Sequence, residues 1–246
     1  MEKDYNLGRW NEVLARKAWL NASTFESYLF DRGTNRIVAK LDNKIVKIRP
    51  DVYYRWRAEK LQMLLCLYSE TPEQIVELGC GYGYNIFTLV ISNRYKHLRG
   101  FDISLNAIHT AKEIAQHFGV ENVEFGLMDL RNSNDPSFRH IKDQTVFTYY
   151  CLEQLPYDAE LILNNILEGR PRRVIHIEPT PELLNPLRPL DLVSYIYMLS
   201  MCYQRKLVGA INEMAISGKV RIVEITRANY APSIRNDPAV IVWEPK

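Results

Sequence analysis

The chain has 246 residues, of which 47% are hydrophobic and 24% charged, and 31 Lys and Arg against 29 Asp and Glu leave a net charge of +2. This balance is typical of a globular protein and excludes a disordered or fibrous chain. The small positive surplus argues against a nucleic-acid backbone or an anionic membrane as a partner.

The amino-terminal stretch MEKDYNLGRW lacks the apolar segment that a secretory signal needs, and no apolar run is long enough to span a membrane. The cysteines Cys66, Cys80, Cys151 and Cys202 are scattered and lack the paired spacing of zinc sites or redox motifs. We therefore expect a cytoplasmic protein with reduced, mostly buried thiols. The sequence makes no prediction of oligomeric state.

Residues 1–70 are expected to form a lid segment of helices and one hairpin. The runs RIVAKL and KIVKIR flank Asp42 and Asn43, which suit a tight turn. A helix ending near LQMLLCLY is predicted to follow.

Residues 71–246 are expected to form one domain, in which short apolar strands alternate with helical stretches. This pattern predicts a mainly parallel sheet with helices on both faces. A helical insertion is expected at about residues 181–217, before a C-terminal hairpin that would form an antiparallel edge. The fold class is therefore α/β, with seven strands: QIVELG, HLRGFDI, VEFGLMD, TVFTYYC, RVIHIEP, VRIVEIT and AVIVWEP.

A glycine-rich turn follows the first of these strands, where VELGCGYGYN places Gly79, Gly81 and Gly83 behind Glu77. Open α/β sheets bind ligands at this edge, and glycine lets a ligand approach the backbone. The spacing is not the Gly-x-Gly-x-x-Gly of dinucleotide sites, because Tyr84 stands where the last glycine would be. Glu77 would repel a pyrophosphate and attract a cationic ligand.

The turn resembles the first motif of class I, Rossmann-like S-adenosylmethionine-dependent methyltransferases, whose cofactor carries an ammonium and a sulfonium and no phosphate. The resemblance implies that Asp102, ending the second strand, holds both ribose hydroxyls, and that Asp129, after the third, accepts from the adenine amino group. Taken singly, Asp102 could instead cap the next helix. Where many relatives have Glu-His-Leu after the fourth strand, this chain has Gln154 in place of the histidine. The expected cofactor-binding residues are Glu77, Gly79, Gly81, Gly83, Asp102, Ile103, Asp129 and Leu130.

Groups for proton transfer are expected at the carboxyl ends of the fourth and fifth strands. His176 and Glu178 are two residues apart and so share one face of an extended segment, while Glu153 follows the fourth strand. A histidine or carboxylate there can accept the acceptor's proton, and we favour Glu178. The structural alternative is that His176 is enclosed in the core and Glu178 binds a backbone amide.

Aromatic residues gather in the lid segment and in the insertion, where the resemblance implies that the substrate pocket is built. The candidates for substrate contact are Tyr28, Tyr53 and Tyr195. Aromatic side chains at helical spacing can equally be part of a core.

The expected activity is methyl transfer to a small-molecule acceptor at oxygen or nitrogen, by direct displacement and without a metal. The fourth strand lacks the Asn/Asp-Pro-Pro-Tyr motif of amide and DNA-amine methyltransferases. Three alternatives stay open: attack at another sulfonium carbon (aminocarboxypropyl transfer or cyclisation), a macromolecular methyltransferase acting on RNA or protein, and a non-catalytic binding protein. The second would need a basic groove, for which the candidates are Arg170, Arg172, Arg173 and Arg188.

Overall fold

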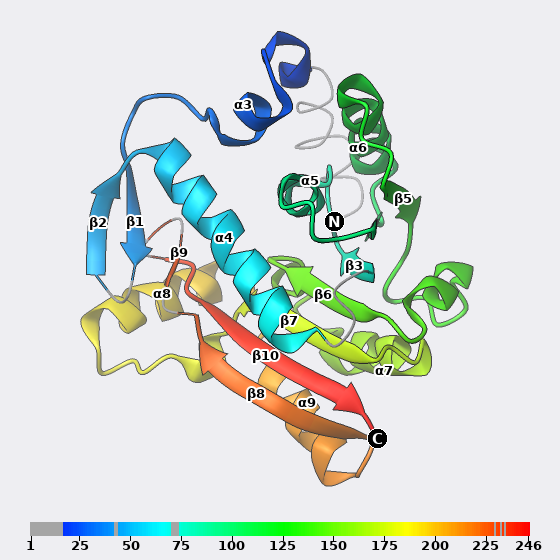
Figure 1. The fold of residues 1–246 in the computed structure, drawn as a ribbon. Helices are drawn as coiled ribbons and strands as arrows, with labels where there is room; N and C mark the ends of the chain where they lie inside the picture. Colours follow the sequence, from blue (N-terminus) through cyan, green and yellow to red (C-terminus); the bar gives the residue numbers. More distant parts are fainter. Residues whose placement is uncertain (1–16, 42–43, 70–73, 229, 232, 234) are drawn as a thin grey trace.

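A seven-stranded sheet lies at the centre of the chain in the computed structural model, which describes residues 17–41, 44–69, 74–228, 230–231, 233 and 235–246 (Figure 1). The strand order is β5-β4-β3-β6-β7-β10-β8, with β3, β4, β5, β6 and β7 parallel and β10 antiparallel to both β7 and β8. The predicted α/β fold, with its antiparallel C-terminal hairpin, is confirmed. The strands span Gln74–Leu78 (β3), His97–Asp102 (β4), Val123–Leu127 (β5), Thr145–Tyr149 (β6), Arg173–Pro179 (β7), Val220–Arg227 (β8) and Pro238–Pro245 (β10).

Helices cover both faces of this sheet and enclose two hydrophobic clusters. One cluster joins Ile75 and Ile175 of the sheet to α4, α5 and α6, and the other joins Val76 and Val174 to α7 and α9. Adjacent strand residues point to opposite faces, so the central strands β3, β6 and β7 supply both clusters. The helices are Phe25–Phe30 (α3), Pro50–Tyr68 (α4), Tyr84–Ile91 (α5), Leu105–Phe118 (α6), Ala159–Glu168 (α7), Pro189–Ser200 (α8) and Leu207–Ile216 (α9).

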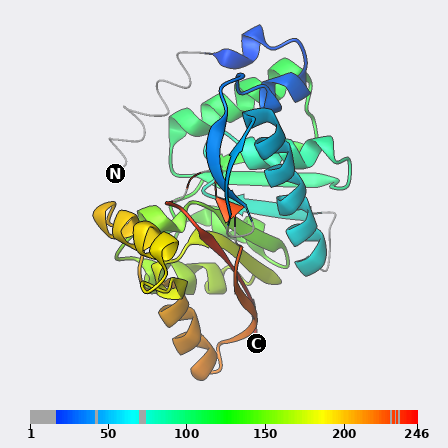
Figure 2. The same cartoon turned by 90° about the vertical axis from the view of Figure 1, so that its left-hand side faces the viewer.

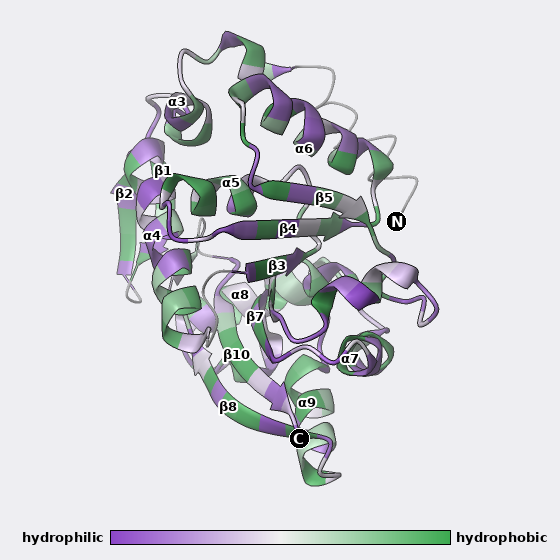
Figure 3. Cartoon of the chain, turned by 45° about the vertical axis from the view of Figure 1, so that its right-hand side comes forward, coloured by the Kyte–Doolittle hydropathy of each residue, from purple (hydrophilic) through white to green (hydrophobic). Residues whose placement is uncertain are grey.

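Helix α6 shows how local sequence fixes an element beside the site. The Ser104 side chain accepts from the Ala107 backbone N–H at its start, and Gly119 in the left-handed conformation ends it. Its buried residues recur three or four positions apart, as on one face of a helix, and Figure 3 shows hydrophilic stretches (purple) between the hydrophobic ones along α6. Because Ser104 supplies the cap, the Asp102 carboxylate is left to the cavity side of β4.

The amino-terminal segment contains the predicted hairpin, with β1 (Ile37–Leu41) antiparallel to β2 (Lys44–Ile48). The predicted turn residues Asp42 and Asn43 lie outside the described part of the chain. A third strand, β9 (Tyr230–Ala231), pairs with β1 and comes from the connection between β8 and β10 (Figure 2). Sequence analysis missed β9, and the lid segment is thereby joined to the main domain.

A buried ion network ties the same parts together. Lys40 of β1 is 1% exposed, and its Nζ lies 2.8 Å from Asp237 and 3.9 Å from Asp191 of α8. Arg227, at the end of β8, pairs with both aspartates. The network therefore joins the hairpin, the β8–β10 connection and the helical insertion.

The predicted insertion contains two helices, α8 and α9, with a non-helical linker at residues 201–206 between them. In the described residues, no helix is both long and apolar enough to cross a membrane. All four cysteines are free thiols, but the expectation that they are mostly buried is wrong for Cys66 and Cys202, which are exposed.

Candidate active site

A cavity of about 850 Å³ opens at the carboxyl ends of the parallel strands. The loops after β3, β4, β5 and β6 form one part of its wall. The lid segment, the start of α5, α8 with the α8–α9 linker, and the β8–β10 connection also line it. Its volume falls within the range usual for small-molecule sites.

In the glycine turn between β3 and α5, Gly79 and Gly81 line this cavity, whereas Gly83 faces Phe87 and Phe125 and does not line it. Gly79, Gly81 and Gly83 all have positive φ, at 74°, 54° and 82°. A Cβ on Gly79 would lie 2.0 Å from the Cys151 sulfur, so a larger residue could not keep this turn against the loop after β6. The turn therefore brings bare backbone to the cavity surface.

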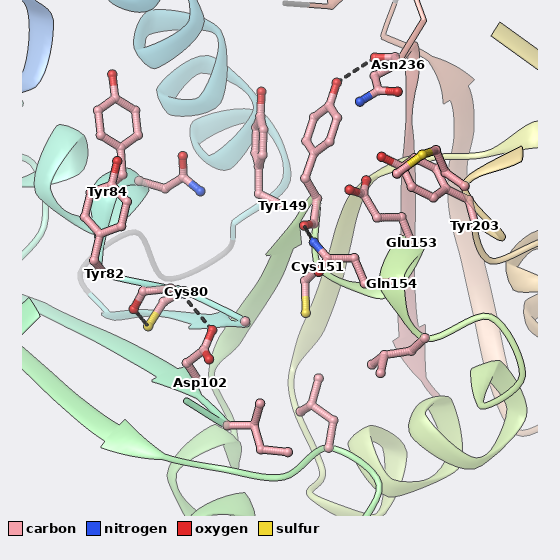
Figure 4. A pocket seen from close by; sticks show the side chains of 18 of the residues that line it. Cys80, Tyr82, Tyr84, Asp102, Tyr149, Cys151, Glu153, Gln154, Tyr203 and Asn236 are labelled. Atoms are coloured by element: carbon pink, nitrogen blue, oxygen red, sulfur yellow. Dashed lines mark hydrogen bonds between the residues drawn. The ribbon is translucent and has the colours of Figure 1, made fainter. Parts of the chain in front are cut away.

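Asp102 lies at the end of β4 beside this turn (Figure 4). Its Oδ2 accepts from the Gly81 N–H at 2.8 Å, and its Oδ1 accepts from the Ser104 N–H at 2.8 Å. Burial raises the pKa of the Asp102 carboxyl, while these hydrogen bonds oppose the shift. Each oxygen can accept a further hydrogen bond, so the carboxylate can bind two hydroxyls of one ligand.

Glu77 lies behind the cavity wall, fully buried. Its Oε1 accepts from the Asn85 side chain at 2.6 Å, and its Oε2 has no hydrogen-bond partner among the described residues. Burial raises the pKa of Glu77 to about 8. Arg57 of α4 donates to the Asn85 Oδ1 at 2.8 Å, and both Arg57 and Asn85 line the cavity. In this part of the site, Asn85 therefore links the buried Glu77 carboxyl to the Arg57 guanidinium by hydrogen bonds.

Asp129 lines the cavity together with Ile103 and Leu130. Its carboxylate accepts from Arg131, whose Nε lies 3.1 Å from Oδ1. A ligand amino group at Asp129 would have to share the carboxylate with this guanidinium. Ile103 and Leu130 supply apolar lining near Asp129, which suits a flat ring.

The loop after β6 carries Glu153 to the opposite end of the cavity. Glu153 is 5% exposed, and Figure 4 shows its carboxylate beside the ring of Tyr203, away from Tyr82 and Tyr84. Burial raises the pKa of Tyr203, and the nearby Glu153 carboxylate raises it further. The Gln204 N–H donates to the Glu153 carbonyl at 2.9 Å, which fixes the α8–α9 linker to this loop.

Glu178 does not line the cavity but supports the loop that carries Glu153. Its carboxylate accepts from the Cys151 N–H at 3.1 and 3.0 Å and from the Glu153 N–H at 3.4 Å. Burial raises the pKa of Glu178 to about 7. This geometry is that of the structural alternative, in which the carboxylate binds backbone amides.

His176 lies in the core, and the structure does not bring it to the cavity. Its Nδ1 lies 3.0 Å from the Thr148 hydroxyl, and its Nε2 accepts from the Trp243 indole N–H at 3.0 Å. Burial lowers the pKa of His176 to about 3, so the ring is neutral near pH 7. With both nitrogens occupied, it is not placed to accept a proton from a ligand.

The three tyrosines predicted to contact substrate lie outside the cavity wall. Tyr28 stacks on Phe118 at 5.6 Å, Tyr53 is fully buried, and Tyr195 packs against the small cluster that contains Tyr203. Other tyrosines line the cavity, and three of them (Tyr54, Tyr197 and Tyr203) lie in the two aromatic segments that were expected to build the pocket. Helical spacing gave no signal to separate these three from the core tyrosines. The tyrosines that line the cavity are Tyr54, Tyr82, Tyr84, Tyr149, Tyr150, Tyr197 and Tyr203.

Residues 70–169 match a family model described as a methyltransferase domain. This segment contains the glycine turn, Asp102, Asp129 and Glu153. Among curated proteins, no match to the sequence was found.

Solved structures share the fold at low sequence identity. Magnesium protoporphyrin IX methyltransferase from Synechocystis PCC 6803 with bound SAH has a TM-score of 0.57 at 15% identity, covering 80% of this chain and 85% of that one. The same enzyme with bound SAM has a TM-score of 0.52 at 14% identity, covering 80% and 81%. The cyclase SpnF has a TM-score of 0.55 at 12% identity, covering 78% and 83%. The matched domain and the shared fold confirm the predicted resemblance to class I S-adenosylmethionine-dependent methyltransferases.

Proposed function

We propose that this class I S-adenosylmethionine-dependent methyltransferase transfers the methyl group to a small-molecule acceptor bound at the Glu153 end of the cavity. The observation that carries the proposal is the cavity itself. Cofactor-type groups lie at one end and a carboxylate among tyrosines at the other. The lid segment and the insertion wall it on further sides, which suits an enclosed metabolite better than a polymer.

The chain's residues fit S-adenosylmethionine. The Asp102 carboxylate suits the two ribose hydroxyls, and Ile103, Leu130 and Asp129 suit the adenine ring and its amino group. Glu77 lies behind the cavity wall and binds Asn85, which lines the cavity, so its proposed role is to hold Asn85 in place rather than to contact the cofactor. When bound, the cofactor supplies an electrophilic methyl group on a sulfonium.

Arg57 is the cofactor-binding residue that we add to those expected from the sequence. It lies one hydrogen bond from Asn85, which in turn binds Glu77. An amino acid carries both an ammonium and a carboxylate, so a guanidinium beside the acidic motif residue suits the methionyl carboxylate.

The residues at the acceptor end would orient the acceptor and receive its proton. Glu153 is the candidate proton acceptor, Glu178 supports its loop, and His176 has no part in the proposal. We also propose that the displacement proceeds without a metal ion. In the described part of the chain, no three His, Cys, Asp or Glu side chains gather as a metal site requires.

One structural neighbour with this fold is a cyclase, so the reaction product is what separates methyl transfer from cyclisation. Of the candidate basic residues, Arg173 is bound by Glu244 at 2.7 Å and does not line the cavity. A cytoplasmic enzyme acting on free metabolites remains our expectation.

The test uses S-adenosylmethionine labelled in its methyl group, the wild-type protein and a cell extract separated by size. We expect label in the fraction of small molecules, with release of S-adenosylhomocysteine. Label in RNA or protein, or release of methylthioadenosine, would contradict the proposal. Binding of S-adenosylhomocysteine without transfer to any fraction would favour a non-catalytic binding protein.

A further inference from the structure

The acceptor end of the cavity has one sign of charge. We define it by six lining side chains, which come from the loop after β6, from α8 and the linker behind it, and from the β8–β10 connection. Glu153 is its one carboxylate, and no lysine or arginine is among the six. The six are Tyr150, Glu153, Tyr197, Met201, Tyr203 and Asn236.

The arginines that line the cavity come from other elements and have other contacts. Arg57 binds Tyr149 and Asn85, Arg131 binds Asp129, and Arg32 lies 4.9 Å over the Tyr84 ring. Arg235 lies 5.6 Å over the Tyr197 ring, but it is exposed and does not line the cavity. A ligand group at the acceptor end therefore meets the field of Glu153 first.

The aromatic rings at this end are held in place. The Tyr150 hydroxyl donates to the Asn236 carbonyl at 2.7 Å, and Tyr150 stacks on Tyr149 at 5.2 Å. Tyr197 and Tyr203 meet edge to face at 6.1 Å. Aromatic rings beside a carboxylate favour a positively charged group over an anion.

From this arrangement we infer that the acceptor is a small amine, methylated at nitrogen, whose nitrogen lies against Glu153. The inference rests on the proposed function and names its substrate class. The amine binds as an ammonium and first releases one proton to water. The neutral amine then donates its lone pair to the methyl carbon as the sulfur–carbon bond breaks, and that bonding pair stays on sulfur. The nitrogen becomes positive and then releases one proton to the Glu153 carboxylate or to water.

Charge development separates this acceptor from an oxygen acceptor. Nitrogen gains positive charge in the transition state, and an adjacent carboxylate stabilises it. A phenolate or carboxylate acceptor is already anionic, and Glu153 would repel it in the ground state. The same carboxylate thus favours one acceptor class both in binding and in reaction.

The test measures binding of three matched probes to the protein saturated with S-adenosylhomocysteine, by calorimetry. The probes are 3-phenylpropylamine, 3-phenylpropanol and 3-phenylpropanoate, which share a body and differ in charge. We expect the amine to bind at least about tenfold more tightly than the carboxylate, since one charge-assisted hydrogen bond contributes about 1.5 kcal/mol or more. Glu153→Gln should remove this preference, while Glu160→Gln, on the exposed side of α7, should keep it.

Equal or tighter binding of the carboxylate to the wild-type protein would overturn the inference, and this result does not depend on the folding of any variant. A preference that survives Glu153→Gln in a folded protein would also overturn it, by placing the amine elsewhere. A protein that fails to bind S-adenosylhomocysteine would instead contradict the proposed function.

Discussion

Glu178 is buried beneath the loop that carries Glu153, and its protonation is therefore linked to folding. Burial raises its pKa to about 7 from 4.5, so the folded protein holds this proton more tightly than the unfolded chain. Because the folded-state pKa is raised, the Glu178 carboxyl stabilises the folded protein fully at pH values below its pKa in the unfolded chain. This stabilisation is lost as the pH rises through the pKa of Glu178 in the folded protein.

Glu178→Gln should therefore change the pH dependence of stability. Between pH 5.5 and 7.5 the wild type should lose about 2 kcal/mol of unfolding free energy relative to the variant. Urea unfolding at the two pH values measures this difference, with Glu160→Gln as an exposed control. If the difference in unfolding free energy between the wild type and Glu178→Gln is the same at both pH values, Glu178 is already ionised at both.

His176 and Glu178 also show where sequence reasoning stops at the scale of residues. Their spacing correctly places both on one face of a strand, but the face alone does not say what covers it. His176 is covered by Trp243 because β10 pairs with β7 in a register that sets Ile241 opposite His176. That register depends on a long-range strand pairing, which periodicity does not reveal.

At the scale of elements, the lid hairpin, the β8–β10 connection and α8 are joined by the Lys40 network. Two buried aspartates share two cations there, and Lys40 is 1% exposed. Removing one partner leaves buried charge uncompensated, which is strongly destabilising. Because Asn236 is adjacent to Asp237, the network also fixes one wall of the acceptor end.

Lys40→Met should lower the unfolding free energy by about 3 kcal/mol, whereas Lys47→Met, on the exposed part of β2, should change it by less than about 0.5 kcal/mol. Guanidinium unfolding compares the two variants. The double change Lys40→Met with Asp237→Leu should cost less than the sum of the single changes. Additive losses would show that Lys40 and Asp237 are not coupled.

Secondary-structure elements were predicted correctly where burial produces a clear pattern of apolar residues in the sequence. The seven strands of the main sheet are apolar runs bounded by turns, and each one forms where it was expected. The two-residue strand β9 is too short to produce a pattern. Tyr53 and Tyr54 differ by one step of α4, so one is buried and the other lines the cavity. The run of aromatic residues there does not reveal the helix's rotational phase.

At the scale of the whole molecule, the cofactor end was predictable because its residues follow successive parallel strands and so meet at one edge. The glycine turn, Asp102 and Asp129 all line the cavity. The acceptor end was not predictable, because it is assembled from the loop after β6, the α8–α9 linker and the β8–β10 connection. These segments are brought together by tertiary contacts such as the Gln204 N–H bond to the Glu153 carbonyl.

The central claim is that this cavity binds S-adenosylmethionine through the turn after β3 and Asp102, and calorimetric titration with S-adenosylhomocysteine tests it most directly. We expect the wild type and the exposed-site control Glu121→Ala to bind alike. Folded Asp102→Ala should bind about ten- to over a hundredfold more weakly, because it lacks a charge-assisted acceptor that contributes about 1.5 to 3 kcal/mol. No binding by the wild type, or unchanged affinity in folded Asp102→Ala, would contradict the account.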